Sequence, residues 1–253
     1  MMPKLFMAYN AWFWVEIFVQ FMTMTIFVFF WRAVYAQNTT IAGLTLQSTL
    51  SYVLLAQLFM PLVNNDLILN FGGLIQQGLI AVELLRPVDF QEMQYIQSLA
   101  LSATNLLLKI PLLFVAWWAF DLQLPGDPAV WGAFLISILL GHAVLFCFDW
   151  ILACLTFYTT EAWGLSVVRS GVALFASGGV VPLRIMPERL ERLVRVLPFA
   201  QALDVPISLL SGVVPLDRAP ELWLEQLIWL VGLLIASRLI FGVAVRKVTV
   251  QGG

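Results

Sequence analysis

Six long apolar blocks constrain the fold of this chain more than any other feature of its sequence. A helix needs about 20 apolar residues to cross the hydrocarbon core of a bilayer, and each block is long enough to do so. The blocks leave no stretch for a separate soluble domain, so we expect one all-α membrane domain over residues 1–253. Six spans also place both termini on the same side. The expected spans are 12–35, 46–70, 96–120, 129–157, 162–182 and 222–244.

The composition agrees with a membrane protein and limits the kinds of partner. Hydrophobic residues make up 61% of the chain and charged residues 11%, with a formal net charge of −2. No basic surface favours nucleic acid, and membrane lipids are the expected surroundings. The first block lacks a small-residue cleavage site and is longer than the core of a signal peptide, so we expect it to be a retained helix.

Lysine and arginine residues do not settle the orientation in the membrane. A cytoplasmic N-terminus puts Lys4, Arg86, Arg246 and Lys247 on the inside. It puts five arginines on the outside, against the usual excess of positive charge in cytoplasmic loops. These are Arg184, Arg189, Arg192, Arg195 and Arg218.

Residues 72–95, between the second and third spans, are too polar to cross the membrane and too apolar to stay in water. The aliphatic side chains predict a short amphipathic helix along the membrane surface. Pro87 disfavours helical backbone at Arg86, so we expect this helix to stop there. The segment is either a docking surface or an ordinary solvated connector, and the residues alone favour neither.

The region between the fifth and sixth spans predicts two short helical elements. Leu190, Leu193, Val194 and Leu197 recur at helical spacing, with charged residues on the opposite face, which is typical of a helix lying in the interface. The apolar run 200–210 that follows contains a proline, and we expect a broken or re-entrant element. Such backbone is tolerated at membrane depth only where protein or water surrounds it.

Small residues form a stripe along the expected fifth span. Gly164, Gly171 and Gly178 recur every seven residues and would let another helix backbone come close. That helix belongs either to the same subunit or to a second subunit, or else the stripe lines a pathway.

Charges inside the bilayer are costly and need an explanation. Lys109 in the third span and Asp149 in the fourth lie on adjacent antiparallel helices, and we expect them to form an ion pair. His142, the only histidine, is expected to be a packed residue, although His142 and Asp149 share a helix face that an intramembrane enzyme could use. With one histidine and no C-x-x-C motif, no metal site is expected.

No phosphate-binding loop of the form G-x-x-x-x-G-K-[ST] occurs in the sequence, so the chain needs a separate motor if ATP drives it. Two groups of residues resemble the permease subunit of ABC-2 type transporters, in the six-helix branch near daunorubicin and antibiotic exporters. The first group is Ile75, Gly78, Leu84, Leu85, Arg86 and Pro87. The second runs from Glu161, Trp163, Gly164 and Arg169 through Ser177, Gly178, Gly179, Pro182, Leu183 and Pro187 to Leu197, Pro198, Phe199 and Pro206.

The resemblance implies a type V exporter-like fold in the inner membrane of a prokaryote, with cytoplasmic termini. It implies two copies of an ABC ATPase that bind ATP and Mg²⁺, and a second permease that is identical or homologous. The short N-terminus, with Lys4 as its one basic residue, departs from relatives that have a longer entry helix. The alternative is a secondary transporter or channel without an ATPase, although matched broken helices in the two halves are absent. The implied coupling residues are Ile75, Gly78, Glu83, Leu84, Leu85, Arg86 and Pro87, and the implied outer-mouth bend is Gly178, Gly179, Pro182 and Pro187.

Overall fold

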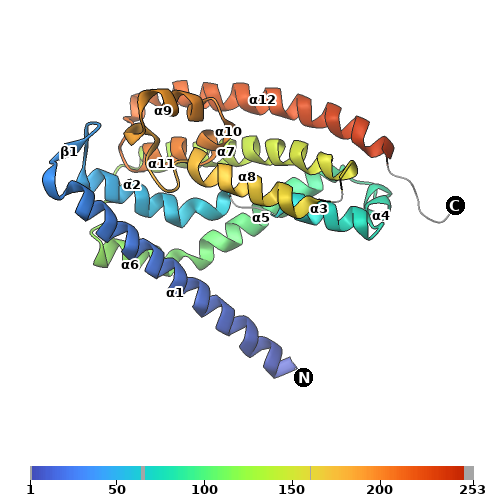
Figure 1. Cartoon of the computed structure of the whole chain (residues 1–253), viewed down its shortest axis with the longest axis horizontal. Coiled ribbons are helices and arrows are strands. Elements are labelled where there is room, and N and C mark those ends of the chain that lie inside the picture. Colours follow the sequence, from blue (N-terminus) through green and yellow to red (C-terminus); the bar gives the residue numbers. More distant parts are fainter. Residues whose placement is uncertain (1, 64–65, 160, 248–253) are drawn as a thin grey trace.

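The computed structural model describes residues 2–63, 66–159 and 161–247, and side chains from Trp14 onward. Long helices run mainly along one direction, and a two-stranded antiparallel hairpin lies at one end of them (Figure 1). The elements are α1 (Met2–Val34), β1 (Thr40–Ile41), β2 (Leu44–Thr45), α2 (Leu46–Phe59), α3 (Leu67–Gln76), α4 (Ile80–Leu84), α5 (Phe90–Leu108), α6 (Ile110–Ala119), α7 (Pro128–Cys154), α8 (Ala162–Ala176), α9 (Glu188–Arg195), α10 (Pro198–Ala202), α11 (Asp204–Leu210) and α12 (Ala219–Ala244).

Within the described residues, 4 stretches are long and apolar enough to cross a membrane without a sharp bend. They are Trp14–Gln37, Leu46–Gln76, Pro128–Phe157 and Leu216–Lys247, the second of which includes the undescribed residues 64–65. Two bent helix pairs, α5 with α6 and α9 with α10–α11, raise the number to 6 if each pair counts as one span. The chain is therefore a multi-pass membrane protein with 4 to 6 candidate spans.

Two of the expected spans differ from the structure. The expected span 96–120 is two helices, α5 and α6, which meet at 42°. The expected span 162–182 contains a helix of 15 residues, α8, which is shorter than a bilayer requires. It ends at Ala176 because Gly178 adopts a left-handed conformation with φ of +79°, which closes the C-terminus of a helix.

Helix α7 forms the centre of the bundle, with α3, α10, α11 and α12 packed around it. It is apolar on all sides, as expected for a helix surrounded by others. Gly141 lets α10 come close, because a Cβ at this position would lie 2.3 Å from the carbonyl oxygen of Gln201. The Gln226 amide of α12 completes this centre by donating to the carbonyl oxygens of Ser137 and Gln201, at 2.9 and 2.8 Å.

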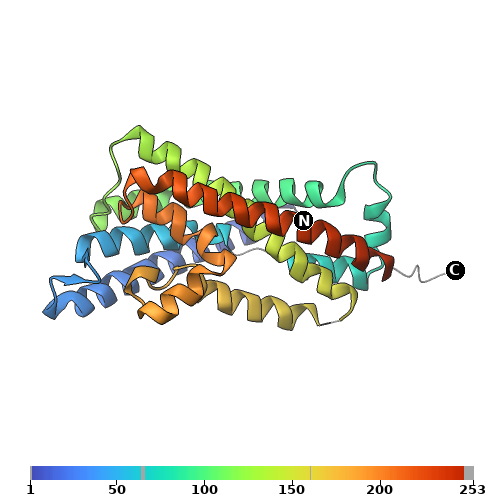
Figure 2. The same cartoon turned by 90° about the horizontal axis from the view of Figure 1, so that it is seen from above.

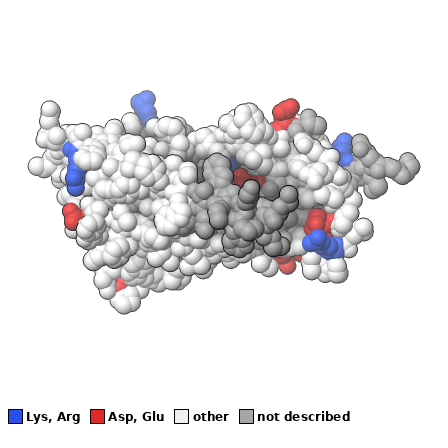
Figure 3. All heavy atoms as spheres, turned by 90° about the horizontal axis from the view of Figure 1, so that it is seen from below, with Lys and Arg blue, Asp and Glu red and all other residues white. Residues whose placement is uncertain are grey.

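The two ends of the bundle carry different elements. Figures 1 and 2 both place α4 and the C-terminal end of α12 at one end, and the β1–β2 hairpin and α9 at the other. The face drawn in Figure 3 is mainly uncharged, with most of its charged side chains towards the two ends. This is the pattern of a bundle whose sides face lipid and whose ends face water.

Candidate functional site

The 72–95 segment folds as a compact turn at the α4 end of the bundle. Helix α3 ends at Gln76, and Gly78 follows with φ of +70°, a conformation that glycine adopts without steric cost. The N–H of Gln77 donates to the carbonyl oxygen of Gly73, and the N–H of Gly78 to that of Ile75. The chain can therefore reverse direction within three residues and begin α4 at Ile80.

One face of this turn is exposed and apolar. The Leu85 side chain is 84% exposed, and Leu79, Val82 and Val88 are also exposed. Arg86 lies beside them and forms an ion pair with Glu83, at 2.9 Å between Nη2 and Oε1. Of the other implied coupling residues, Gly78 and Pro87 are exposed, whereas Ile75 and Leu84 are half-buried. The structure thus brings these residues together on one short surface element.

The opposite face of the turn packs on an aromatic cluster. We call Phe71, Phe90, Trp150, Phe157 and Phe241 the aromatic cluster; its rings come from α3, α5, α7, the turn after α7, and α12. The ring centroids of Phe71 and Trp150 lie 4.9 Å apart, and those of Trp150 and Phe241 lie 5.2 Å apart. Closely packed interiors have low compressibility and transmit displacement. Through this cluster the turn is packed against both α7 and α12.

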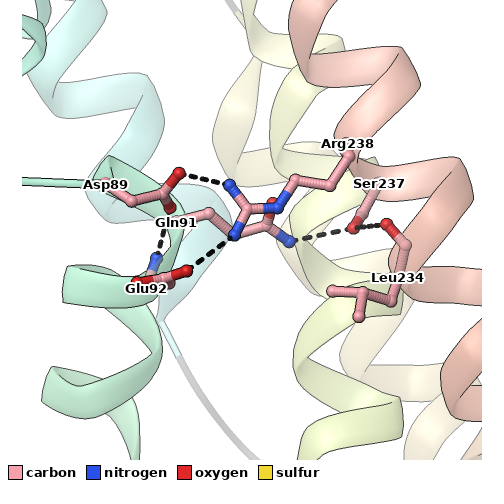
Figure 4. Close-up of polar contacts among 6 residues, drawn as sticks. All are labelled: Asp89, Gln91, Glu92, Leu234, Ser237 and Arg238. Atoms are coloured by element: carbon pink, nitrogen blue, oxygen red, sulfur yellow. Dashed lines mark hydrogen bonds and ion pairs between the residues drawn. The ribbon is translucent and has the colours of Figure 1, made fainter.

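Polar contacts connect the same turn to α12 (Figure 4). Arg238 points from α12 between two carboxylates at the start of α5, with an ion pair to Asp89 and another to Glu92 at 3.4 Å. Beside it, the amide of Gln91 donates to the Ser237 hydroxyl at 2.9 Å. We call these five residues the α5–α12 clamp. Sequence reasoning missed Arg238, although a charge inside an apolar block was a visible signal.

Asp89 has a second role in the clamp, because it is also the N-cap of α5. Its carboxylate accepts a hydrogen bond from the backbone N–H of Glu92 at 2.9 Å, as N-cap residues do. Partial burial by itself raises the pKa of this carboxyl. The hydrogen bonds from Arg238 and from the backbone outweigh that effect and lower the pKa below its ordinary value.

At the other end, a buried polar group surrounds the bend after α8. The Tyr52 hydroxyl donates to Asp204 at 2.7 Å, and Arg195 lies 3.5 Å from the second oxygen of Asp204. A Cβ at Gly178 would lie 2.3 Å from the Tyr52 hydroxyl, so only glycine fits there. Gly179 and Pro182 are close by, and Pro187 precedes α9. The four residues of the implied bend therefore lie in one region, beside a cavity of about 460 Å³.

The expected ion pair between Lys109 and Asp149 is wrong, because each residue has a different ionic partner. Asp149 accepts two hydrogen bonds from Arg169 of α8, one of them 2.7 Å long, and both side chains are buried. Arg169 also lies over the Phe199 ring, 5.6 Å from its centroid. Lys109 instead lies 3.4 Å from the Gln20 side-chain oxygen and 4.0 Å from Glu16. Helix α7 turns its carboxylate towards α8 rather than towards α5.

Comparison with known proteins settles the family. A model described as an ABC-2 family transporter protein matches residues 21–252. The chain belongs to the ABC-2 transporter family. No curated protein and no solved structure matches it. The resemblance read from the sequence is thereby confirmed at the level of the family, and the protein is a membrane subunit of the ABC-2 transporter class.

The glycine stripe of this ABC-2 protein divides into two parts. Gly178 is buried and packed against Tyr52, within the same subunit. A Cβ at Gly164 or Gly171 would meet nothing within 4 Å, and the neighbouring Val168 and Phe175 are exposed. The outward part of the stripe therefore packs on nothing in the described part of the subunit.

Proposed function

We propose that the chain is the permease subunit of an ATP-driven ABC exporter, in which a separate ATPase supplies the energy. The observation that carries this proposal is the exposed 72–95 turn, which is connected to both α7 and α12. A partner that pushes on Leu85 and Arg86 acts on the turn, and the aromatic cluster and the α5–α12 clamp pass the displacement to the helices. Different contacts in two conformations are what couple a partner to a change of state.

The assembly that we propose contains two ATPase subunits, which bind ATP and Mg²⁺, and two permeases. The second permease is identical or homologous, and the outward face of α8, with Gly164 and Gly171, is our candidate for its contact surface. We place the complex in the inner membrane of a prokaryote. The 72–95 turn and both termini then face the cytoplasm, and the Gly178–Pro187 bend faces outward. The substrate class is open among drugs, lipids, peptides and glycans.

The test is purification of the tagged full-length protein in mild detergent, followed by mass spectrometry of the proteins that remain bound. We expect a P-loop ATPase, together with one or two kinds of permease. Arg86→Ala should weaken ATPase retention and transport-coupled hydrolysis while membrane insertion is unchanged, because Arg86 lies on the exposed docking face.

Arg192→Ala is the matched control. Arg192 also forms a local ion pair on a short helix, with Glu188 at 3.2 Å, but it lies on α9 at the opposite end of the bundle. Recovery of the intact protein without any ATPase would contradict the proposal and favour a secondary transporter or channel. If Arg86→Ala and Arg192→Ala reduced ATPase retention equally, the result would contradict a docking role for the 72–95 turn.

A further inference from the structure

The cavity beside the Gly178–Pro187 bend has charges of both signs in its wall. It measures about 460 Å³, which is in the range of pockets that hold small molecules. Three arginines and four acidic residues line it, which leaves a formal net charge of −1. Four of the charged residues form an exposed rim, so a ligand can enter from water. They are Arg184, Arg218, Glu221 and Glu225.

Two buried polar residues of α11 lie deeper in the same wall, and we call Asp204 and Ser208 the floor of the cavity. They are one helical turn apart on one face, and they are 3% and 5% exposed. Within the described residues, the Ser208 hydroxyl has no hydrogen-bond partner. A buried polar group without a partner costs free energy, so this hydroxyl favours a ligand that bonds to it.

Asp204 adds a carboxylate to the floor. An ionised carboxylate has about four acceptor positions. One oxygen of Asp204 accepts from the Tyr52 hydroxyl at 2.7 Å, and the Leu183 backbone also donates to this carboxylate. Arg195 lies 3.5 Å from the second oxygen, which is longer than the usual 2.7–2.9 Å or so of a charged hydrogen bond. The floor therefore offers acceptors to a ligand that carries N–H donors.

Two rim residues carry opposite charges that the described part of the protein does not pair. Arg184, in the turn before α9, donates to the carbonyl oxygen of Val213 at 3.1 Å and forms no ion pair there. Glu225 of α12 has no ion pair there either. The other charged wall residues form ion pairs with one another. A guanidinium has five N–H donors and binds a carboxylate through two of them, so Arg184 has donors left for an anionic group.

We propose that this cavity binds a small zwitterion with a primary ammonium and a carboxylate, the end groups of an amino acid or a short peptide. The ammonium donates to Asp204 and Ser208, and the carboxylate lies on Arg184. The negative wall disfavours a ligand with anionic groups alone. A metal ion is disfavoured because, among the described residues, no group of three His, Cys, Asp or Glu side chains could hold one. Val213 and Leu222 give the wall an apolar part for a side chain of the ligand.

The experiment uses the full-length protein in nanodiscs of phosphatidylcholine, whose headgroup has no N–H to donate. The probes are the common free amino acids and a set of dipeptides. They are screened by the melting temperature of the protein, because a ligand that binds only the folded state raises it. The affinity of the best probe is then measured by equilibrium dialysis with radiolabel. Its N-acetylated form lacks the ammonium, and its C-terminal amide lacks the carboxylate. We expect each to bind about tenfold more weakly, the ratio for one lost charge contact.

Four variants assign the end groups of the ligand to the wall. Arg184→Gln should weaken the zwitterion about tenfold and leave the affinity of the C-terminal amide unchanged, because the amide lacks this contact. Ser208→Ala should weaken the zwitterion and its amide several-fold. Val214→Trp places a large side chain in the cavity and should abolish binding. Arg189→Gln is the control, because Arg189 is an exposed arginine of α9 outside the cavity wall.

Three results would overturn the proposal. The first is a panel in which no probe raises the melting temperature. The second is binding of both capped forms, or of phosphocholine, as tightly as the zwitterion, which would indicate a lipid headgroup or a nonspecific site. The third is unchanged binding in Val214→Trp. If Val214→Trp does not fold, Arg184→Gln decides, since equal losses for the zwitterion and its amide contradict a contact with the carboxylate. The measurement needs neither an ATPase nor a second permease, so its outcome is independent of the proposed function.

Discussion

Arg169 holds Asp149 in a two-point ion pair, with both side chains buried between α7 and α8. Because Arg169 also lies over the Phe199 ring of α10, one guanidinium joins three elements. The short helix α10 is thereby attached to the central helix α7 through a cation–π contact and an ion pair, as well as by apolar packing.

We predict that Arg169→Met lowers the free energy of unfolding by about 3–5 kcal/mol, because it leaves a buried carboxylate without its cation. The double variant Arg169→Met with Asp149→Leu should recover most of that loss. The stabilities of the single and the double variant are compared by heating each protein in detergent and using size-exclusion chromatography to measure how much remains folded. A double variant as unstable as the single one would contradict this reading.

Lys109→Met and Asp149→Asn should have additive effects on the free energy of unfolding, since these two residues do not pair.

Gly178→Ala should destabilise the protein by about 2 kcal/mol or more, because a side chain is strained at this φ and collides with Tyr52. Gly171→Ala, inside the preceding helix α8, is the matched control, because the added methyl group meets open space there. There we expect a slight stabilisation of about 0.5–1 kcal/mol, the usual gain of alanine over glycine inside a helix. Melting temperatures of the two variants should therefore move in opposite directions.

The low pKa of Asp89 makes the α5–α12 clamp sensitive to acid. A carboxyl whose pKa is lower in the folded state stabilises the fold above its ordinary pKa of 3.8 and loses that contribution as the pH falls through the folded value. The melting temperature of wild type should therefore exceed that of Asp89→Asn at neutral pH, and the difference should shrink below pH 3.8. Arg238→Gln should reduce the same pH dependence, because it removes the main favourable partner. If the difference in melting temperature between wild type and Asp89→Asn grew as the pH fell, it would contradict the stabilising role of the Asp89 carboxylate.

Within the proposed transporter, Arg238→Gln should uncouple ATP hydrolysis from transport. The variant keeps the exposed face of the 72–95 turn, so ATPase binding should remain, while the contact from α5 to α12 is lost. We expect transport per ATP hydrolysed to fall several-fold in reconstituted vesicles. Arg246→Gln, in the short turn that follows α12, is the control. Loss of ATPase binding in Arg238→Gln would show that the clamp shapes the docking surface instead of transmitting its movement.

The sequence predicted the uninterrupted helices well, because the ends of a long apolar run mark the approximate ends of the helix. The expected span 129–157 corresponds to α7, which begins at Pro128 with Asp127 as its N-cap, and 222–244 corresponds to α12. The bend at Lys109 was missed, although Pro111 was a signal for it. Hydropathy adds up apolar character along a window and does not register a single lost hydrogen bond.

The contacts between helices were harder to predict, because depth in the membrane does not fix rotation about the helix axis. Lys109 and Asp149 were matched by depth alone, yet Asp149 faces α8. Arg238 and Gln91 are 147 residues apart in the sequence, and only tertiary packing places them in one clamp. Local features such as the N-cap at Asp89 and the turn at Gly78 depend on neighbouring residues, and these are the parts of the site that a sequence can reveal.

The sparse packing of α1 has a consequence for biosynthesis. Only 17% of the most apolar part of this helix is buried. Within the described side chains, its polar contacts to later helices run from Gln20 and Glu16 to α2 and Lys109. The ribosome completes α1 before it synthesises α2 and α5. Entry of α1 into the bilayer therefore depends on its own hydropathy and not on packing against these helices. Substitutions on the lipid-facing side of α1 should therefore change the efficiency of membrane insertion more than the packing of the other helices.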